Sequence, residues 1–418
     1  MNKDILCKTN ECLTCKTKPC QLGCPLNNDI TSFIKYTRDK KYKEAYDVLT
    51  KTTIMPAICG LICPYETQCQ GMCVKGVSYE PVNIGEIEAN VGKYALDRKW
   101  MPAYPKKTKY HVLVIGGGPA GLTCAAFLRR NGIKVTIMER YDYLGGLLVH
   151  GIPDFRLPRN LIKKTTERIT DMGINVIYNK ELGKDFKLKD VINKYDAIFL
   201  GIGANIPNQM HIPGEELEGV YGGNKLLEDG TKLDLTDKHV VVVGGGNVAM
   251  DVSRSLIRMN AKKVTVIYRS SKEEMVASKK EIEEAIEDGV KFKFQTNLVA
   301  IHGTDKVEKI EVVDTDLIKE EYKLRLTAVN IPDSNHFMKC DAVVMAIGSH
   351  ADPELVKSLK LKLDQNGKID IDANGHTSNK KIFAGGSIAG SKGTVAWASR
   401  SGRNAAYEII NYLKKTSN

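Results

Sequence analysis

The chain has 418 residues, of which 42% are hydrophobic and 27% charged, with a formal net charge of +11. This length suffices for two to four domains, and no stretch approaches the roughly 18 consecutive apolar residues of a membrane helix, so we expect no membrane insertion. The lysines are scattered along the chain, which indicates a solvated basic surface and argues against nucleic-acid binding.

Cysteines dominate the first part of the chain, where 9 of the 11 fall within residues 1–73. They include the runs Cys12-x2-Cys15-x4-Cys20-x3-Cys24 and Cys59-x3-Cys63-x5-Cys69-x3-Cys73, with a proline directly after Cys24 and after Cys63. Closely spaced thiolates with a following proline are typical of iron-sulfur ligands, although these gaps differ from those of bacterial ferredoxins. The pattern therefore predicts metal clusters in the N-terminal region.

Structural zinc and disulfides are the alternatives for these cysteines. Zinc sites prefer two C-x2-C pairs or Cys/His mixtures, whereas this region has one C-x2-C and no histidine before His111. Disulfides require an oxidising compartment, but Met1 is followed by the polar residues 2–4, without an apolar signal region. We therefore favour clusters over zinc and expect a cytoplasmic protein.

The elements between and after the cysteine runs predict a small helical domain. Residues 30–36 and 42–49 have apolar side chains at helical spacing. The stretch 100–107 contains two prolines and two lysines and is typical of a linker. An α/β region begins after it.

The first glycine-rich turn follows the strand His111–Ile115 and opens a helix that extends to Arg130. Its sequence, Gly116-Gly117-Gly118-Pro119-Ala120-Gly121, fits the dinucleotide-binding pattern G-x-G-x-x-G. Glycines permit the tight turn and the close approach of a pyrophosphate, which the helix N-terminus attracts. A second strand, 135–138, ends at Glu139, at the separation expected for an acid that binds a ribose hydroxyl.

The second turn repeats this design from residue 240 to residue 267. The strand Val240–Val243 leads into Gly244-Gly245-Gly246-Asn247-Val248-Ala249, and the strand 264–267 follows the helix. This second strand ends in Tyr268-Arg269-Ser270-Ser271-Lys272, so cations and hydroxyls replace the acid. Such residues suit a 2′-phosphate, which favours NADPH over NADH.

Two dinucleotide sites in one chain imply that one dinucleotide reduces the other, and flavin is the natural acceptor of a nicotinamide hydride. A flavin also converts a two-electron donor into the single electrons that iron-sulfur centres accept. This transfer needs no proton-shuttling side chain, so we predict no general acid or base.

Several segments together resemble the glutamate synthase small subunit and the N-terminal part of dihydropyrimidine dehydrogenase, over nearly the whole chain. They are the cysteine runs and residues 58–64, 82–88, 145–146, 151–158 and 246–251. By this resemblance, residues 340–348 would be the return to the flavin domain, and residues 382–387 a C-terminal flavin contact. The resemblance implies an α/β fold class, in which an all-α iron-sulfur domain (1–105) precedes two nested Rossmann-like domains. The flavin domain would comprise 106–208 and 341–418, and the NAD(P)H domain 209–340.

The same resemblance implies FAD, NADPH (or NADH) and two [4Fe-4S] clusters as cofactors. One cluster would be held by Cys12, Cys15, Cys20 and Glu88, and the other by Cys24, Cys63, Cys69 and Cys73. The dinucleotide-binding residues would be Gly116, Gly118, Pro119, Ala120, Gly121, Glu139, Arg140, Gly146, Leu147, Arg156, Gly203, Gly244, Gly246, Asn247, Val248, Ala249, Arg269, Lys272, Gly386, Ser387 and Thr394. Glu88 could instead be a surface carboxylate, and we expect Cys59 to be a buried apolar residue and Cys7 to lie outside the ligand pattern.

Two positions depart from the family pattern. Ser387 stands where the family usually has the Asp that binds the ribityl chain of the flavin, and Val276 stands where proline is common. We still expect FAD binding, because the pyrophosphate turn and Glu139 are intact.

The function implied is an NAD(P)H-oxidising electron-input subunit that passes electrons through FAD and two clusters to a partner. That partner would be an electron-accepting subunit or a ferredoxin-like carrier, since no module for an organic substrate remains. A stand-alone NAD(P)H:acceptor oxidoreductase and a non-enzymatic iron-sulfur redox sensor are alternatives. A disulfide reductase would need a redox dithiol, whereas only Cys124 and Cys340 follow residue 73.

Overall fold

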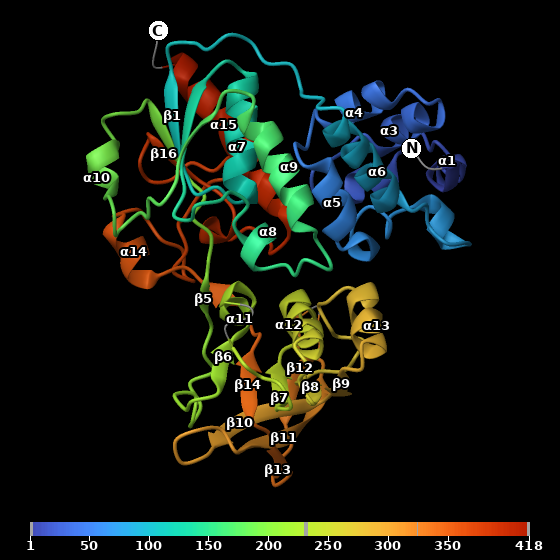
Figure 1. Ribbon diagram of the computed structural model, residues 1–418, viewed down its shortest axis with the longest axis vertical. Coiled ribbons are helices and arrows are strands. Elements are labelled where there is room, and N and C mark those ends of the chain that lie inside the picture. Colours follow the sequence, from blue (N-terminus) through green and yellow to red (C-terminus); the bar gives the residue numbers. More distant parts are fainter. Residues whose placement is uncertain (1–2, 230–232, 324, 416–418) are drawn as a thin grey trace. The chain divides into compact units, whose positions relative to one another are not determined.

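The computed structural model describes residues 3–229, 233–323 and 325–415. The chain folds into two compact units, shown in Figure 1. Unit 1 comprises Met1–Val149, Asp154–Ala204 and Ala351–Asn418, and unit 2 comprises His150–Pro153 and Asn205–His350. The chain thus returns to unit 1 after His350, whereas we expected this return at residue 341.

The N-terminal part of unit 1 is helical, as predicted, and carries all nine early cysteines. Its elements are α1 (Lys3–Asn10), α2 (Pro19–Gly23), α3 (Ile30–Arg38), α4 (Tyr42–Leu49), α5 (Pro56–Ile62), η1 (Tyr65–Thr67), η2 (Val74–Val77) and α6 (Ile84–Asp97). Asn83 caps α6, because its side chain accepts a hydrogen bond from the Glu86 N–H at 3.3 Å. Helix α6 packs along α5 and also contacts α3 and α4, so it forms the centre of this part.

A parallel sheet forms the rest of unit 1. Its five strands lie in the order β16 (Ile382–Ala384), β4 (Ala197–Leu200), β1 (His111–Ile115), β2 (Lys134–Met138) and β3 (Asn175–Ile177). The helices of this part are α7 (Pro119–Arg130), α8 (Leu147–His150), α9 (Arg159–Thr170), α10 (Leu188–Val191), α14 (Pro353–Ser358), η4 (Ser387–Ala389) and α15 (Val395–Lys415). Helices α7, α9 and α15 gather on one side of the sheet in Figure 1, and α15 packs along α7.

Unit 2 is built around a second five-stranded parallel sheet. Its strands lie in the order β6 (Val220–Gly222), β14 (Ala342–Met345), β7 (His239–Val243), β8 (Lys263–Ile267) and β9 (Lys291–Lys293). The helices are α11 (Gly223–Asp229), α12 (Asn247–Arg258) and α13 (Lys279–Glu287). Strand β14 pairs with β6 and β7, so this segment belongs to unit 2 and is not the expected return to the flavin fold.

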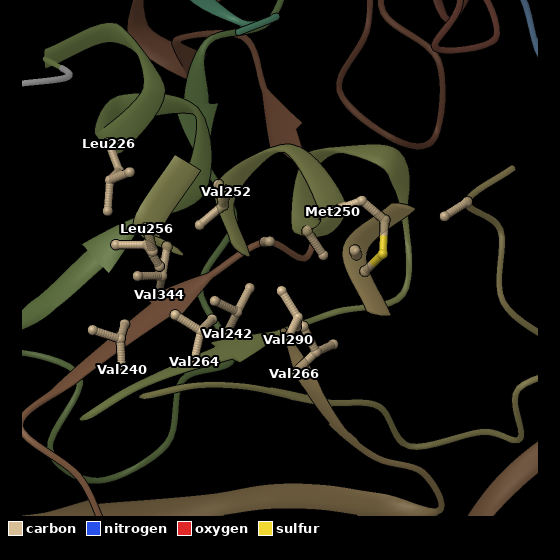
Figure 2. Close-up of a cluster of buried hydrophobic side chains, with 14 of the residues drawn as sticks. Leu226, Val240, Val242, Met250, Val252, Leu256, Val264, Val266, Val290 and Val344 are labelled. Atoms are coloured by element: carbon tan, nitrogen blue, oxygen red, sulfur yellow. The ribbon is translucent and has the colours of Figure 1, made fainter. Parts of the chain in front are cut away.

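The core of unit 2 explains why its valine-rich strands are fully apolar. Figure 2 shows Val240, Val242, Val264 and Val344 of the sheet beneath Met250, Val252 and Leu256 of α12. The opposite face of the sheet packs on an antiparallel sheet of β10 (Thr296–His302), β11 (Lys309–Ile318), β12 (Thr327–Asn330) and β13 (His336–Lys339). Strands β5 (Ile206–Pro207) and β15 (Ser349–His350) pair separately. Parallel strands covered on both faces lack the polar alternation of an exposed sheet.

None of the helices in the described ranges combines the length and apolar character of a membrane span.

Candidate cofactor sites

Four cysteines from different elements line one cavity in the helical part of unit 1. Cys12 and Cys15 lie between α1 and α2, Cys20 lies in α2, and Cys73 precedes η2. Burial raises the pKa of the Cys12 thiol, and the neighbouring thiols of Cys15 and Cys73 raise it further. Burial likewise raises the pKa of Cys20 to about 11, with Cys12 and Cys73 adding to the effect. We call Cys12, Cys15, Cys20 and Cys73 the first cysteine group.

A second group combines three cysteines with a carboxyl group. Burial raises the pKa of Cys24 to about 11, and the charge of Glu88 raises it further. Burial also raises the pKa of Cys69, where Cys24 and Glu88 act in the same direction. Cys63 directly follows α5. Its pKa is raised, first by the hydrogen bond with Cys59, then by burial, and further by the charges of Glu88 and Cys69. We call Cys24, Cys63, Cys69 and Glu88 the second cysteine group.

The partition of these residues differs from the sets that the resemblance implied. Cys73 lies with the first group and Glu88 with the second, whereas we expected the opposite. The fold gives the reason for Cys73: Lys75, two residues later, pairs with Glu11 at 2.7 Å, beside Cys12. For Glu88 the reason is that α6 packs against α5, which ends at Cys63.

Glu88 is not a surface carboxylate, since it is only 7% exposed. The Nδ2 of Asn28 donates a hydrogen bond to its Oε1 at 3.2 Å, and Asn28 in turn accepts one from the Thr52 hydroxyl. Burial raises the pKa of Glu88 well above its usual value, and within the described residues no cation pairs with it. A buried, oriented carboxyl without a counter-ion beside three thiols is a donor set that fits a metal cluster.

The remaining early cysteines lie outside both groups. Cys59 is 1% exposed and packs with Leu26 and Ala396, and Cys7 is exposed. Within the described residues, no three His, Cys, Asp or Glu side chains converge as the ligands of a single metal ion do. The ligands of a four-iron cluster need no such convergence, because each of them binds a different iron.

The first glycine turn has the shape of a pyrophosphate cradle. Gly116 follows β1 with a φ of +100°, and a Cβ there would lie 2.5 Å from the Gly201 carbonyl oxygen. A Cβ on Gly118, by contrast, would meet nothing within 4 Å, so this glycine borders open space. Gly118 also caps α7 without a side chain, which leaves the first-turn N–H groups available to an anion.

Glu139 lies beside this turn, where the sequence predicted it. It is 4% exposed, and its carboxylate accepts hydrogen bonds from the N–H of Gly117 at 2.6 Å and of Tyr141 at 3.0 Å. Two segments distant in the chain come close to the turn: a Cβ on Gly146 would lie 3.0 Å from the Gly118 Cα, and one on Gly386 would lie 3.2 Å from the Ala120 Cβ. All the other predicted flavin residues also belong to unit 1, namely Pro119, Arg140, Leu147, Arg156, Gly203, Ser387 and Thr394.

The second glycine turn repeats the cradle in unit 2. Gly244 has a φ of +140°, Gly246 caps α12, and a Cβ on Gly246 would meet nothing within 4 Å. Val276 and Ala277 both donate their N–H groups to the Gly245 carbonyl at 3.0 Å. A proline at position 276 could not make this bond, so valine here contributes to the turn.

The side chains beyond β8 are those that would meet the second ribose. Arg269 and Lys272 are exposed, and neither forms an ion pair with a carboxylate in the described part of the chain. Asn247 accepts a hydrogen bond from the Ser278 N–H at 3.0 Å, which ties the turn to the start of α13. Val248 and Ala249 follow it in the first turn of α12.

Comparison with known proteins decides the family. The chain is 35% identical to the glutamate synthase [NADPH] small chain of Escherichia coli (strain K12) over 429 residues, covering 97% of this chain and 91% of that protein. The chain belongs to the glutamate synthase small chain family. Its residues 1–100 match the family described as dihydropyrimidine dehydrogenase domain II, 4Fe-4S cluster, and residues 110–403 match the pyridine nucleotide-disulphide oxidoreductase family. The resemblance to the glutamate synthase small subunit, the α/β fold class and the assignment as an oxidoreductase are thereby confirmed.

Two further relatives delimit what this family shares. The NADP(+)-dependent formate dehydrogenase subunit beta of Moorella thermoacetica is 33% identical, with 96% of this chain and 60% of that protein covered. Mycobacterium tuberculosis FprA in complex with NADPH has the same fold over 74% of this chain and 86% of its own, with a TM-score of 0.66 and 19% identity. Much of the sequence and the fold of this chain therefore also occur in proteins that carry other names.

A redox dithiol of the disulfide-reductase kind is not found in residues 110–403 of this family member. That region holds two cysteines, Cys124 in α7 of unit 1 and Cys340 in unit 2, and both are buried. Sequence reasoning missed Asn28, which bonds Glu88, and two arginines of α15, Arg400 and Arg403. No local motif marks them, because the residues they contact lie 24 to 377 positions away.

Proposed function

We propose that this chain is the NADPH-oxidising small chain of a glutamate synthase, which passes electrons to a partner subunit. Bound FAD would supply the conversion between a hydride and single electrons, and two [4Fe-4S] clusters would carry them onward. The observation that carries the proposal is the packing of the second cysteine group against the flavin fold. Cys24 and Cys63 pack on a core of Leu26, Cys59 and Ala396, at the start of α15.

The two cysteine groups support one cluster each. We propose that Cys12, Cys15, Cys20 and Cys73 hold the first, and that Cys24, Cys63, Cys69 and Glu88 hold the second. Backbone N–H groups of Asn28 and Leu26 oppose the effect of burial on the pKa of Cys24. Such N–H donors stabilise a thiolate, which is the form that binds iron.

The flavin would lie on the first glycine turn, with Glu139 at its ribose. Gly118 and the uncapped start of α7 fit the pyrophosphate, and Ser387 lies at the start of η4, which the neighbouring Gly386 caps. A serine hydroxyl can still hydrogen-bond the ribityl chain, although it carries no charge. We therefore expect FAD to bind through the turn and Glu139, with Ser387 in a supporting position.

NADPH would lie on the second turn, with its 2′-phosphate between Arg269 and Lys272. These exposed cations are free to accept a phosphate, and no acid follows β8 to bind a bare ribose hydroxyl. The names of the E. coli and M. thermoacetica relatives include NADPH and NADP(+), which supports this choice.

The first cysteine group lines a cavity and has exposed apolar neighbours, which suits the point where electrons leave. Cys12, Cys15 and Cys73 are half-buried, and the apolar side chains next to them in sequence, Leu13, Met72 and Val74, are exposed. Exposed apolar side chains around a redox centre are suited to a stable subunit contact. Relatives that are named as small chains or beta subunits support a partner of this kind.

The proposal is tested by anaerobic titration of the purified chain with NADPH and then with NADH. We expect about one flavin and eight iron atoms per chain, bleaching of the flavin absorption by NADPH before NADH, and two EPR signals of reduced clusters. A chain that contains zinc in place of iron, or a flavin that only NADH bleaches, would contradict the proposal. Co-expression with a glutamate synthase large chain then tests the partner: NADPH-dependent glutamate formation by the pair supports it, and turnover only with small soluble acceptors indicates a stand-alone reductase.

A further inference from the structure

Helix α15 fixes the backbone that carries the second cysteine group. The guanidinium of Arg403 donates hydrogen bonds to the carbonyls of Leu26 at 2.8 Å and Thr52 at 2.9 Å. Arg400, one turn earlier, donates to the Pro25 carbonyl at 3.3 Å. Residues 25 and 26 directly follow Cys24, and Thr52 bonds the Asn28 side chain that holds Glu88. Both arginines therefore bond backbone segments that position Cys24 and Glu88.

These arginines bring positive charge without a carboxylate to balance it. Within the described residues, neither Arg400 nor Arg403 forms an ion pair, and their hydrogen-bond acceptors are neutral carbonyls. Arg254 in unit 2, by contrast, pairs with Glu281, Glu284 and Asp288 at 2.5–3.0 Å. The two arginines therefore leave positive charge beside the second cysteine group that no carboxylate of the described residues neutralises.

An iron-sulfur cluster in the second group would be an anion close to this charge. An oxidised [4Fe-4S] core carries two positive charges and its four ligands carry four negative ones, so the cluster is an anion that gains further charge on reduction. Burial lowers the pKa of Arg403, while the charge of Cys24 acts in the opposite direction, so Arg403 is within electrostatic reach of this group. A fixed cation stabilises the more negative, reduced cluster and raises its reduction potential.

We propose that Arg403 is the counter-cation of the cluster in the second cysteine group and sets its reduction potential above the value that the ligands alone would give. This inference rests on the proposed function, because it requires that cluster. Arg403 is a positioning and tuning residue that touches backbone carbonyls, not a ligand. Its two short bonds place the charge in one fixed position beside the segment after Cys24.

The test is a potentiometric titration of the full chain with its cofactors, followed by low-temperature EPR. Arg403→Met removes the charge and keeps most of the aliphatic stem. We expect the midpoint potential of one cluster to fall by at least 59 mV, a tenfold change in its one-electron equilibrium, while the other cluster keeps its midpoint. Glu88→Gln identifies the affected cluster, because only the cluster with the carboxylate ligand changes its EPR signal. In Arg403→Lys, which retains the charge, the midpoint potential of the same cluster should fall by less than half as much.

The matched control is Arg129→Met in α7. Arg129 also donates to two carbonyls, of Met172 and Pro105, both at 2.8 Å, but these belong to the flavin fold and its linker. The Arg129→Met substitution should leave the midpoint potentials of both clusters unchanged. If Arg403→Met loses iron, Arg403→Gln retains a donor without the charge and should show the same fall.

The outcomes separate this inference from the proposed function. A chain with two clusters whose midpoints are unaffected by both neutral variants refutes the role of Arg403 alone. An equal fall in Arg403→Lys and Arg403→Met also refutes it, because geometry and not charge would then be responsible. A chain without clusters refutes the proposed function and this inference together.

Discussion

The contact between α5 and α6 should control whether the second cysteine group forms. Gly60 of α5 faces α6 so closely that a Cβ would lie 2.3 Å from the amide nitrogen of Ala89 and 2.6 Å from the Gly85 carbonyl oxygen. These atoms are backbone, so none can rotate away. The helices would have to separate by about 1 Å to reach the 3.4 Å at which ordinary contact begins.

We predict that Gly60→Ala destabilises unit 1 and releases the second cluster. Alanine gains about 1 kcal/mol over glycine in a helix interior, but overpacking costs about 1–3 kcal/mol. With only backbone to displace, we expect the upper end of that cost and a net loss of about 2 kcal/mol, or on the order of 4 °C in the thermal transition. Because α5 ends beside Cys63 and Ala89 follows Glu88, helix separation moves these two groups apart.

The assay is iron content and EPR of the purified variant, together with its thermal transition. We expect about four iron atoms per chain in place of eight, with loss of the signal that Glu88→Gln alters. Gly393→Ala is the control, because a Cβ there would meet nothing within 4 Å and its φ is ordinary. Full iron content in Gly60→Ala, or an equal effect in Gly393→Ala, would refute the argument from helix contact.

Three further predictions concern the ligand sets, the nucleotide and the pH dependence of stability. Cys20→Ser and Cys73→Ser should abolish the same EPR signal, while Cys24→Ser abolishes the other; pairing of Cys73 with Cys24 would restore the sets that we first expected. Arg269→Ala should raise the KM for NADPH tenfold or more and leave that for NADH unchanged in steady-state kinetics, since a charge-assisted hydrogen bond contributes about 1.5–3 kcal/mol. The Arg258 guanidinium lowers the pKa of Asp288, so the stability gained is complete above the unfolded pKa of about 3.9 and is lost as pH falls through the folded value. In Arg258→Met, the stability of α12 and α13, measured by amide hydrogen exchange, should fall less steeply as the pH is lowered. A pH dependence equal to that of the unmodified chain would contradict the prediction.

Local signals in the sequence were sufficient for both dinucleotide folds. The strands before Gly116 and Gly244 lie within one residue of their predicted bounds, because a β-branched apolar run ending in glycines has few alternatives. The helices predicted over 30–36 and 42–49 are present as α3 and α4 for the same reason. Local signals could not predict the residue at which the chain leaves unit 2. Strand β14 is as apolar as a strand of either sheet, and only its pairing with β6 and β7 assigns it to unit 2.

The spacing of the cysteines could not predict which of the two groups each one joins, for a different reason. Cys20 and Cys24 are four residues apart, yet they belong to different groups, because α2 ends between them and Cys24 has an extended backbone with φ −81° and ψ 121°. Cys73 joins the first group through a turn that an ion pair from Lys75 to Glu11 holds. Such long-range contacts leave no periodic trace in the sequence.

The two dinucleotide folds share a frame that extends beyond their glycines. His111 and His239 begin β1 and β7, the strands that lead into the two glycine turns, and each donates its backbone N–H at 2.7 Å to an aspartate, Asp196 or Asp341. Each imidazole also meets a threonine of the adjacent strand, at 2.9 Å for Thr136 and 3.1 Å for Thr265. The repeated frame places the residue after the second strand at the same point in both units. At that point unit 1 has the buried Glu139, whereas unit 2 has Tyr268, directly followed by the exposed Arg269. The end of this strand is therefore where we expect the choice between the two dinucleotides to be made.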